Sequence, residues 1–296
     1  MSLEILLFDA FVANGKGGNR AAVVFGLDLE SERKMQELAS SLGVPATVFV
    51  GISQKLFEDE SPLPLRLRFF TPHTEENVCG HGTIAALLAI QARGGINGWA
   101  VPSGQFQLET NLGLQHAKIE GSTAWLEYPN PKTWEVDLER EAVAVALGLE
   151  VEDLHEDLPI LGAGVGRTKL VCAVPSTVLL DAIEPNTDEL RALCLATRTS
   201  GLVVFTFPGR GGCFTDLRHF SLQENTILED SATGNAHAAL AAYLATQAFF
   251  DNGQRSFSGA QGYAMQQPSR LEVRCVVQDN TVSSLWVGGK AKEVRP

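Results

Sequence analysis

The stretch Asn77–Ile90, NVCGHGTIAALLAI, decides how the rest of the chain can be interpreted. From Ile84 to Ile90 every residue is apolar, and a helix that is apolar all round is a buried one. The first turn differs, because a thiol, an imidazole and two glycines stand at positions 79–82. A helix start carries unpaired N–H donors and about half a positive charge, so it attracts anions. We therefore predict a buried helix whose N-terminus opens onto a pocket for a small carboxylate.

A second copy of this pattern lies about 150 residues further along the chain. It is Asp230–Leu244, DSATGNAHAALAAYL, in which a glycine and polar residues again precede an Ala/Leu helix. Upstream, Leu67–Thr71 (LRFFT) is echoed by Leu217–Ser221 (LRHFS). The repeated order of strand, loop, glycine turn and buried helix predicts two similar halves. If these halves face each other, both helix starts point into one cleft.

Composition limits the classes of protein that this chain can belong to. It has 296 residues, of which 45% are hydrophobic and 20% charged, as in globular proteins. Its net charge of −12 argues against a nucleic acid or an anionic membrane as partner. We find neither a signal peptide nor an apolar run of the ~20 residues that span a membrane. The five cysteines are odd in number and scattered, so we expect a reduced, cytoplasmic protein.

The order of the predicted elements favours an α+β fold over a parallel βαβ fold. Leu65–Phe70 alternates as a half-exposed strand does. Four short strands are then expected in an antiparallel meander. They cover Trp99–Pro102, Gln105–Thr110, Leu112–Ile119 and Thr123–Tyr128.

Several ordered segments resemble one known family, the phenazine-biosynthesis (PhzF-like) isomerases of the diaminopimelate epimerase superfamily. Each segment alone is moderately specific, but together they run from one end of the chain to the other. The N-terminal segments are Asp9–Phe11 (DAF), Gly17–Val24 (GGNRAAVV) and Phe70–Thr83 (FTPHTEENVCGHGT). The C-terminal segments are Glu229–Ala236 (EDSATGNA), Gln261-Gly262, Pro268–Arg270 (PSR) and Val287–Gly289 (VGG).

The resemblance implies two similar domains, each with a curved, mainly antiparallel sheet around a central helix. We expect the first at residues 1–117 with a C-terminal strand at about 284–296, and the second at 118–283. The active site would lie between them, at the two helix starts. The resemblance also implies proton transfer next to a carboxylate or ketone without a cofactor, and a homodimer.

One departure from the family concerns its general base. Relatives carry a glutamate in a segment like SETaFV, where this chain has Val44–Val50, VPATVFV, with Ala46 at the glutamate position. A methyl group cannot accept a proton. Either another group is the base, or the chain does not catalyse the family reaction.

Three side chains are candidates for catalysis. Cys79 at a helix start would have a lowered pKa and could exchange a proton with a substrate carbon; the alternative is a small packing residue. His81 could polarise a substrate carbonyl or carboxylate; the alternative is a cap of its helix. Asp230 could orient His81 or a substrate amine, or shuttle a proton; the alternative is a carboxylate that stabilises the helix start.

Substrate oxygens would be bound by N–H groups at both helix starts. The predicted binding residues are Gly80, Gly82, Thr233, Gly234 and Asn235, the last also through its side-chain NH₂.

The remaining polar residues are given other roles. His73, Cys79 and His81 do not have the spacing of a zinc motif, so we expect no metal. Asp9 and Asn19 are expected to line the cleft. Three single histidines in strands or loops are interpreted as structural, namely His116, His155 and His219. The four other cysteines are expected to be core residues; these are Cys172, Cys194, Cys213 and Cys275.

The sequence leaves three functions open. The first is a cofactor-independent isomerase or epimerase of a small carboxylic or amino acid. The second is a catalytically impaired relative that binds a small carboxylate. The third is an acyl-transfer enzyme with Cys79 as nucleophile and His81 as base, for which the two side chains would have to face each other.

Overall fold

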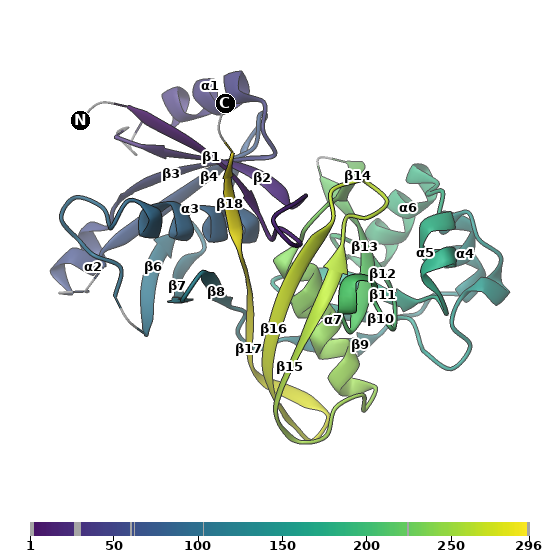
Figure 1. Cartoon of the computed structure of the whole chain (residues 1–296). Coiled ribbons are helices and arrows are strands. Elements are labelled where there is room, and N and C mark those ends of the chain that lie inside the picture. The colour runs from purple at the N-terminus through teal and green to yellow at the C-terminus, as the bar shows by residue number, and fades with distance from the viewer. Residues whose placement is uncertain are drawn as a thin grey trace. The chain divides into compact units, whose positions relative to one another are not determined.

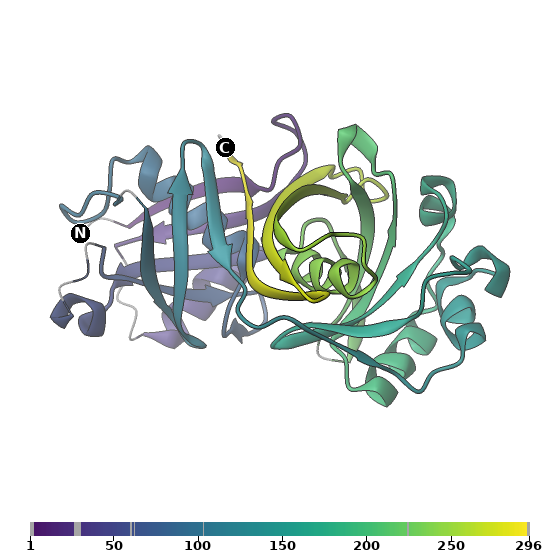
Figure 2. The ribbon, with the colours of Figure 1, turned by 90° about the horizontal axis from the view of Figure 1, so that it is seen from below.

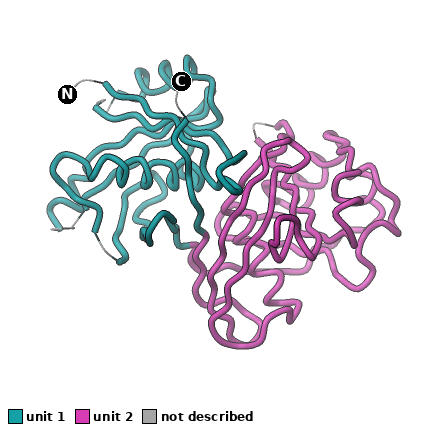
Figure 3. Tube along the Cα trace, viewed as in Figure 1, with its two compact units in different colours: residues 1–127, 288–296 teal, residues 128–287 magenta. Residues whose placement is uncertain are grey.

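The computed structural model describes residues 3–26, 31–59, 61, 63–102, 104–223 and 225–294. The chain divides into two compact units, residues 1–127 with 288–296 and residues 128–287 (Figure 3). Each unit is built around one helix, α3 in unit 1 and α7 in unit 2 (Figure 1).

Unit 1 surrounds α3 with strands from both ends of the chain. The order β18-β1-β2-β3-β4-β6-β7-β8 is antiparallel except for the pairs β2–β3 and β4–β6. The short β5 pairs with β4 on the way to α3. The bounds are β1 Glu4–Ala10, β2 Asn19–Phe25, α1 Glu32–Leu42, β3 Ala46–Ile52, α2 Gln54–Glu58, β4 Leu65–Phe70, β5 Glu75–Glu76, α3 Gly80–Ala92, β6 Gln105–Thr110, β7 Gly113–Glu120, β8 Thr123–Glu127 and β18 Ala291–Val294.

Unit 2 repeats this topology. The series β10-β11-β12-β13-β15-β16 is antiparallel except for β11–β12 and β13–β15, and β14 pairs with β13 just before α7. The bounds are β9 Lys132–Glu135, α4 Arg140–Leu147, η1 Val151–Asp153, β10 Leu161–Val165, β11 Arg167–Ala173, α5 Thr177–Ala182, α6 Thr187–Thr197, β12 Gly201–Thr206, η2 Arg210–Gly212, β13 Thr215–Gln223, β14 Thr226–Asp230, α7 Gly234–Thr246, β15 Gly253–Gln261, β16 Ser269–Gln278 and β17 Thr281–Gly289.

Both central helices have the buried character that the sequence predicts. Each has 13 residues, and α3 is buried from Gly82 to Ile90. In unit 2 the strands curve around α7, which Figure 2 shows nearly end-on. A second layer of α4, α5 and α6 covers the opposite face of β11 and β12. The α+β fold of two similar halves, each with a mainly antiparallel sheet and a central helix, is therefore confirmed.

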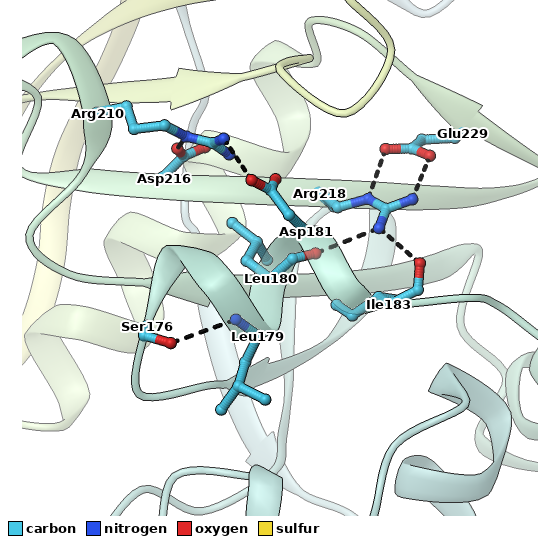
Figure 4. A network of polar contacts seen from close by, with 9 residues as sticks. All are labelled: Ser176, Leu179, Leu180, Asp181, Ile183, Arg210, Asp216, Arg218 and Glu229. Atoms are coloured by element: carbon cyan, nitrogen blue, oxygen red, sulfur yellow. Dashed lines mark hydrogen bonds and ion pairs between the residues drawn. The ribbon is translucent and has the colours of Figure 1, made fainter.

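A paired arginine and glutamate precede each central helix. In unit 1, Arg68 donates to both oxygens of Glu75, at 2.7 and 2.6 Å. In unit 2, Arg218 donates to both oxygens of Glu229, at 2.8 and 2.7 Å (Figure 4). Both arginines are largely buried. A bidentate arginine–carboxylate pair fixes the relative orientation of the two side chains as well as pairing their charges. The weak sequence repeat between the halves therefore reflects the same bidentate Arg–Glu pair, which joins the two strands that precede each central helix.

Two predictions about strands are wrong. Trp99–Pro102 is not a strand, because Asn97 and Gly98 adopt positive φ and leave only an isolated bridge between Ile96 and Trp99. Strand β4 is not half-exposed, because the pairing with Glu75 allows Arg68 to be 8% exposed inside the unit.

The expected domain limits fall inside strands. The limit at 117/118 lies within β7 and the limit at 283/284 within β17. The compact units divide the chain at 127/128, directly after β8, and at 287/288, four residues further along β17. β18 pairs with β1, so the end of the chain completes the sheet of unit 1. Within the described residues, no helix combines the length and the apolar character that a membrane crossing requires.

Candidate functional site

The start of α3 presents a thiol and an imidazole. Cys79 is the N-cap with an extended backbone, φ −143° and ψ 111°. Its carbonyl oxygen accepts from the amide of Thr83 at 2.9 Å and from the hydroxyl of Thr83 at 2.8 Å. Its side chain makes no cap bond, so the sulfur is left for other contacts.

Cys79 and His81 face each other. The sulfur lies 3.4 Å from Nδ1 and 3.8 Å from Nε2 of the ring. Both residues are partly exposed. An imidazole at this distance can hold the thiol proton and leave a thiolate. The acyl-transfer alternative required the side chains of Cys79 and His81 to face each other, and they do. The same contact would also allow Cys79 to act as an acid/base group.

The other glycine of this turn, Gly82, is buried and has a packing role. A methyl group there would lie 2.8 Å from Cγ2 of Val48 and 3.3 Å from Cδ1 of Phe69. The absence of a side chain lets α3 approach β3 and β4 closely. This packing accounts for a glycine at position 82, whereas Gly80 starts the helix and is partly exposed.

The start of α7 has a different arrangement, centred on Thr233. Its hydroxyl donates to Oδ2 of Asp230 instead of capping the helix. The fully buried Gln261, at the end of β15, accepts from the Thr233 amide at 3.0 Å. The amide nitrogen of Gln261 donates to the carbonyl oxygen of Asp230 at 2.6 Å and to the Thr233 hydroxyl at 3.2 Å. The turn that carries Asp230 is therefore held in one conformation from β15.

His219, on β13, contacts the same hydroxyl group of Thr233. Its Nδ1 lies 3.0 Å from Oγ1 of Thr233. The ring is 2% exposed, and burial, together with the neighbouring Lys169, Arg167 and His237, lowers its pKa well below 6.5. The histidine is therefore neutral.

The other two predicted binding residues of unit 2, Gly234 and Asn235, are each in contact with another part of the same unit. A methyl group on Gly234 would lie 2.4 Å from the hydroxyl oxygen of Tyr128, so only glycine fits. The side-chain nitrogen of Asn235 donates to the carbonyl oxygen of Val165 at 2.8 Å. That bond uses one of the two hydrogens that we expected to orient a substrate carboxylate.

The position of the family glutamate is apolar. Ala46 begins β3, is 3% exposed, and lies in register with Ala21. Nearby in unit 1, Asp9 and Arg20 form an ion pair at 2.8 Å. Across the described parts of the chain, no three His, Cys, Asp and Glu side chains are grouped as metal ligands would be.

Sequence reasoning missed Lys169, Gln261 and Tyr128, and gave His219 a structural role only. A signal for His219 exists in the repeat, because the position that is Phe69 in the first copy is a histidine in the second. No comparable signal marks Lys169, since a lysine in a short strand is usually exposed. The four cysteines predicted as core are buried.

Comparisons with known proteins cover the whole chain. The sequence model of the family described as phenazine biosynthesis-like protein matches residues 8–295. An uncharacterized isomerase, YddE, of Escherichia coli O157:H7 is 31% identical, over 98% of this chain and 96% of that protein. The trans-2,3-dihydro-3-hydroxyanthranilate isomerase of Pseudomonas aeruginosa is 28% identical, over 96% and 94%. The crystal structure of a PhzF-family protein of Bacillus anthracis superposes with a TM-score of 0.86 at 25% identity, over 100% and 98%.

Proposed function

Because this chain belongs to the phenazine biosynthesis-like (PhzF-like) family, we propose that it is a cofactor-independent isomerase or epimerase of a small carboxylic or amino acid. The reaction removes a proton from the carbon next to the substrate carboxylate and returns one. The relatives that are named as isomerases support this class of reaction.

The observation that carries the proposal is the contact of 3.4 Å between the Cys79 sulfur and Nδ1 of His81 at the open start of α3. His81 takes the thiol proton, and the thiolate then removes the proton next to the carboxylate. The charge that develops on the substrate is stabilised by N–H donors at a helix start. We assign Cys79 as the acid/base group and His81 as its partner.

Residues at the start of α7 supply the remaining roles. We assign Asp230 as a second acid/base group. The backbone N–H groups of Gly234 and Asn235, with those of Gly80 and Gly82 in α3, bind carboxylate oxygens. The predicted role of the Thr233 amide is withdrawn, because that amide donates to Gln261.

Deuterium exchange tests the proposal. The protein is incubated in D₂O with a panel of amino acids, hydroxy acids and trans-2,3-dihydro-3-hydroxyanthranilate, and loss of the C–H signal is followed by NMR. Cys79→Ser is expected to lower the exchange rate about 100-fold or more, because a positioned acid/base group contributes ~10²–10⁴-fold. His116→Gln, an exposed histidine of β7, is the control and should exchange as the wild type does.

The same experiment separates the alternatives. A protein that exchanges no C–H on any acid, yet melts at a higher temperature with a carboxylate, is a binding relative that lost its base at Ala46. Ester hydrolysis that depends on Cys79, without exchange, would instead establish acyl transfer, which the Cys79–His81 contact also permits.

We also propose a homodimer in the cytoplasm, as the resemblance and the odd number of scattered cysteines suggest. Sedimentation equilibrium should give twice the chain mass of 31.9 kDa. A mass of one chain at micromolar concentration would contradict the dimer.

A further inference from the structure

Gln261 and Gly262, at the end of β15, form a motif that the proposed function does not use. The side chain of Gln261 is fully buried. Gly262 has a φ of +78°, and a methyl group there would lie 2.6 Å from the carbonyl oxygen of Ser231. The end of β15 is therefore packed against the turn of residues 230–233, which leads into α7.

The side-chain amide of Gln261 can lie in one orientation only. Its oxygen accepts from the backbone N–H of Thr233 at 3.0 Å, and its nitrogen donates to the carbonyl oxygen of Asp230 at 2.6 Å. A backbone N–H only donates and a carbonyl oxygen only accepts, so a flipped amide would lose both bonds. The amide nitrogen also donates to Oγ1 of Thr233 at 3.2 Å. One buried side chain thus holds both ends of the turn.

The hydroxyl group of Thr233 has three partners. It donates its hydrogen to Oδ2 of Asp230 and accepts from the side chain of Gln261. Nδ1 of His219 lies 3.0 Å from the same oxygen. A hydroxyl has one hydrogen and two lone pairs. With the hydrogen given to Asp230, the hydroxyl oxygen can only accept from His219, and both of its lone pairs are then occupied.

A second arrangement of the hydrogens would reverse this chain. A protonated Asp230 would donate to Thr233, and Thr233 would donate to Nδ1 of His219. Burial lowers the pKa of His219 well below 6.5, so the ring is neutral and carries one hydrogen. In the second arrangement that hydrogen would lie on Nε2, which is buried without a hydrogen-bond partner among the described residues.

The surroundings of Nε2 decide between the two arrangements. A buried N–H without an acceptor is rare in folded proteins, and rarer than an acceptor without a donor. The hydrogen of His219 is therefore assigned to Nδ1, where it is donated to Thr233. Thr233 consequently donates to Asp230, and Oδ2 of Asp230 is an acceptor.

We propose that Gln261 and His219 are positioning residues that make the Thr233 hydroxyl a donor to Asp230 and so present this side chain as an oriented carboxylate. The inference rests on the acid/base role proposed for Asp230. In that role the carboxylate takes the proton of a substrate C–H bond, and the electron pair of that bond stays on the substrate. Gln261 and His219 act through Thr233 and the backbone of the turn, because both are buried behind it.

Two pairs of substitutions separate the hydrogen bonds from the volume of the side chains. Gln261→Met has a similar size and removes all three bonds of the amide. Gln261→Glu keeps the acceptor for the Thr233 amide but places an oxygen against the carbonyl oxygen of Asp230. Thr233→Val keeps the backbone amide and removes the hydroxyl, whereas Thr233→Ser retains it. Gln254→Met changes an exposed glutamine of the same strand and is the control.

Kinetics of the deuterium exchange described above test the positioning. We expect Gln261→Met, Gln261→Glu and Thr233→Val each to lower kcat about tenfold or more with KM unchanged, since a positioned acid/base group contributes ~10²–10⁴-fold. Thr233→Ser should recover most of the rate that Thr233→Val loses, and Gln254→Met should exchange as the wild type does.

The Asp230→Asn background separates positioning from a general structural role. There, Gln261→Met should have no further effect on the exchange rate, because Gln261 acts through the carboxylate that is already gone. An equal loss with and without the carboxylate would overturn the inference. Wild-type exchange in Gln261→Met would overturn it as well.

Nuclear magnetic resonance without substrate tests the hydrogen bonds separately from the proposed function. In ¹⁵N-labelled protein near neutral pH, the ring signals of His219 should show the hydrogen on Nδ1. The variant His219→Asn, whose amide can still donate to Thr233, identifies these signals by their loss. A hydrogen on Nε2 would mean that Thr233 donates to His219 instead of Asp230, and the inference would be wrong.

The carboxyl carbon of Asp230 gives a second signal, identified by its loss in Asp230→Asn. Gln261→Met should move its ¹³C chemical shift and Gln254→Met should not. An unchanged shift in Gln261→Met would contradict the positioning role. If no acid exchanges deuterium but both signals behave as expected, the proposed function fails and the arrangement of Gln261, His219 and Thr233 around Asp230 stands.

Discussion

His237, in the first turns of α7, illustrates how a single buried ring couples folding to pH. It is fully buried, and its Nδ1 lies 3.2 Å from the carbonyl oxygen of Thr233. Burial lowers its pKa from 6.5 to about 4. Between these two pH values, His237 is therefore neutral in the folded protein and protonated in the unfolded chain.

We predict that His237 makes unfolding easier as the pH falls. Its contribution to stability is fully present above pH 6.5 and is lost as the pH falls through about 4. From the size of the shift, the loss is on the order of 3 kcal/mol. His237→Gln should flatten the pH dependence of the free energy of unfolding, measured with urea at pH 4.5 and 7.5. Parallel curves for the wild type and His237→Gln would contradict the assignment.

At the scale of elements, both central helices begin at a glycine, and at the start of α7 the surrounding fold leaves little room for a side chain. Gly234 begins α7 below the hydroxyl group of Tyr128, a residue near the start of unit 2. The helix start and the segment before β9 are therefore fitted to each other, and this contact keeps the N–H groups of the first turn in place.

Gly234→Ala is expected to destabilise the protein by about 1–3 kcal/mol, the usual cost of an overpacked site. The added methyl would lie 2.4 Å from the Tyr128 oxygen but 3.3 Å from the ring carbon Cζ. Tyr128→Phe should therefore restore part of the stability when combined with Gly234→Ala. Thermal unfolding of the four proteins measures this coupling. Equal melting temperatures for wild type and Gly234→Ala would show that the contact does not exist.

At the scale of the whole molecule, the chain contains two copies of one topology. Each unit has its own central helix, its own bidentate Arg–Glu pair and its own series of paired strands around the helix. Unit 2 is one continuous segment, residues 128–287, whereas unit 1 needs both ends of the chain.

We predict that residues 128–287 form a domain that folds alone. Expressed by itself, this segment should unfold cooperatively on heating. The segment 118–283, which follows the limits expected from the sequence, should be less stable because it lacks residues 284–287 of β17. It also carries part of β7 and the whole of β8, which belong to unit 1. A more stable 118–283 segment would support the limits expected from the sequence.

The sequence by itself determined the features that depend on local composition. The apolar runs after Gly80 and Gly234 predict buried helices, and the glycine-rich turns before them predict open helix starts. The ordered motifs identified the family, and with it the fold. Periodicity correctly predicted β4 at Leu65–Phe70 and two hairpins of the meander.

Only the tertiary structure decided which side chains meet. The facing of Cys79 and His81 depends on backbone angles at the N-cap. The burial of Lys169 and His219 on one face depends on the register of three neighbouring strands, β11, β12 and β13. Composition does not encode such register, because it is set by long-range packing and hydrogen bonding. The chemistry available to each polar residue therefore follows from the fold, whereas the existence of the two central helices follows from the sequence.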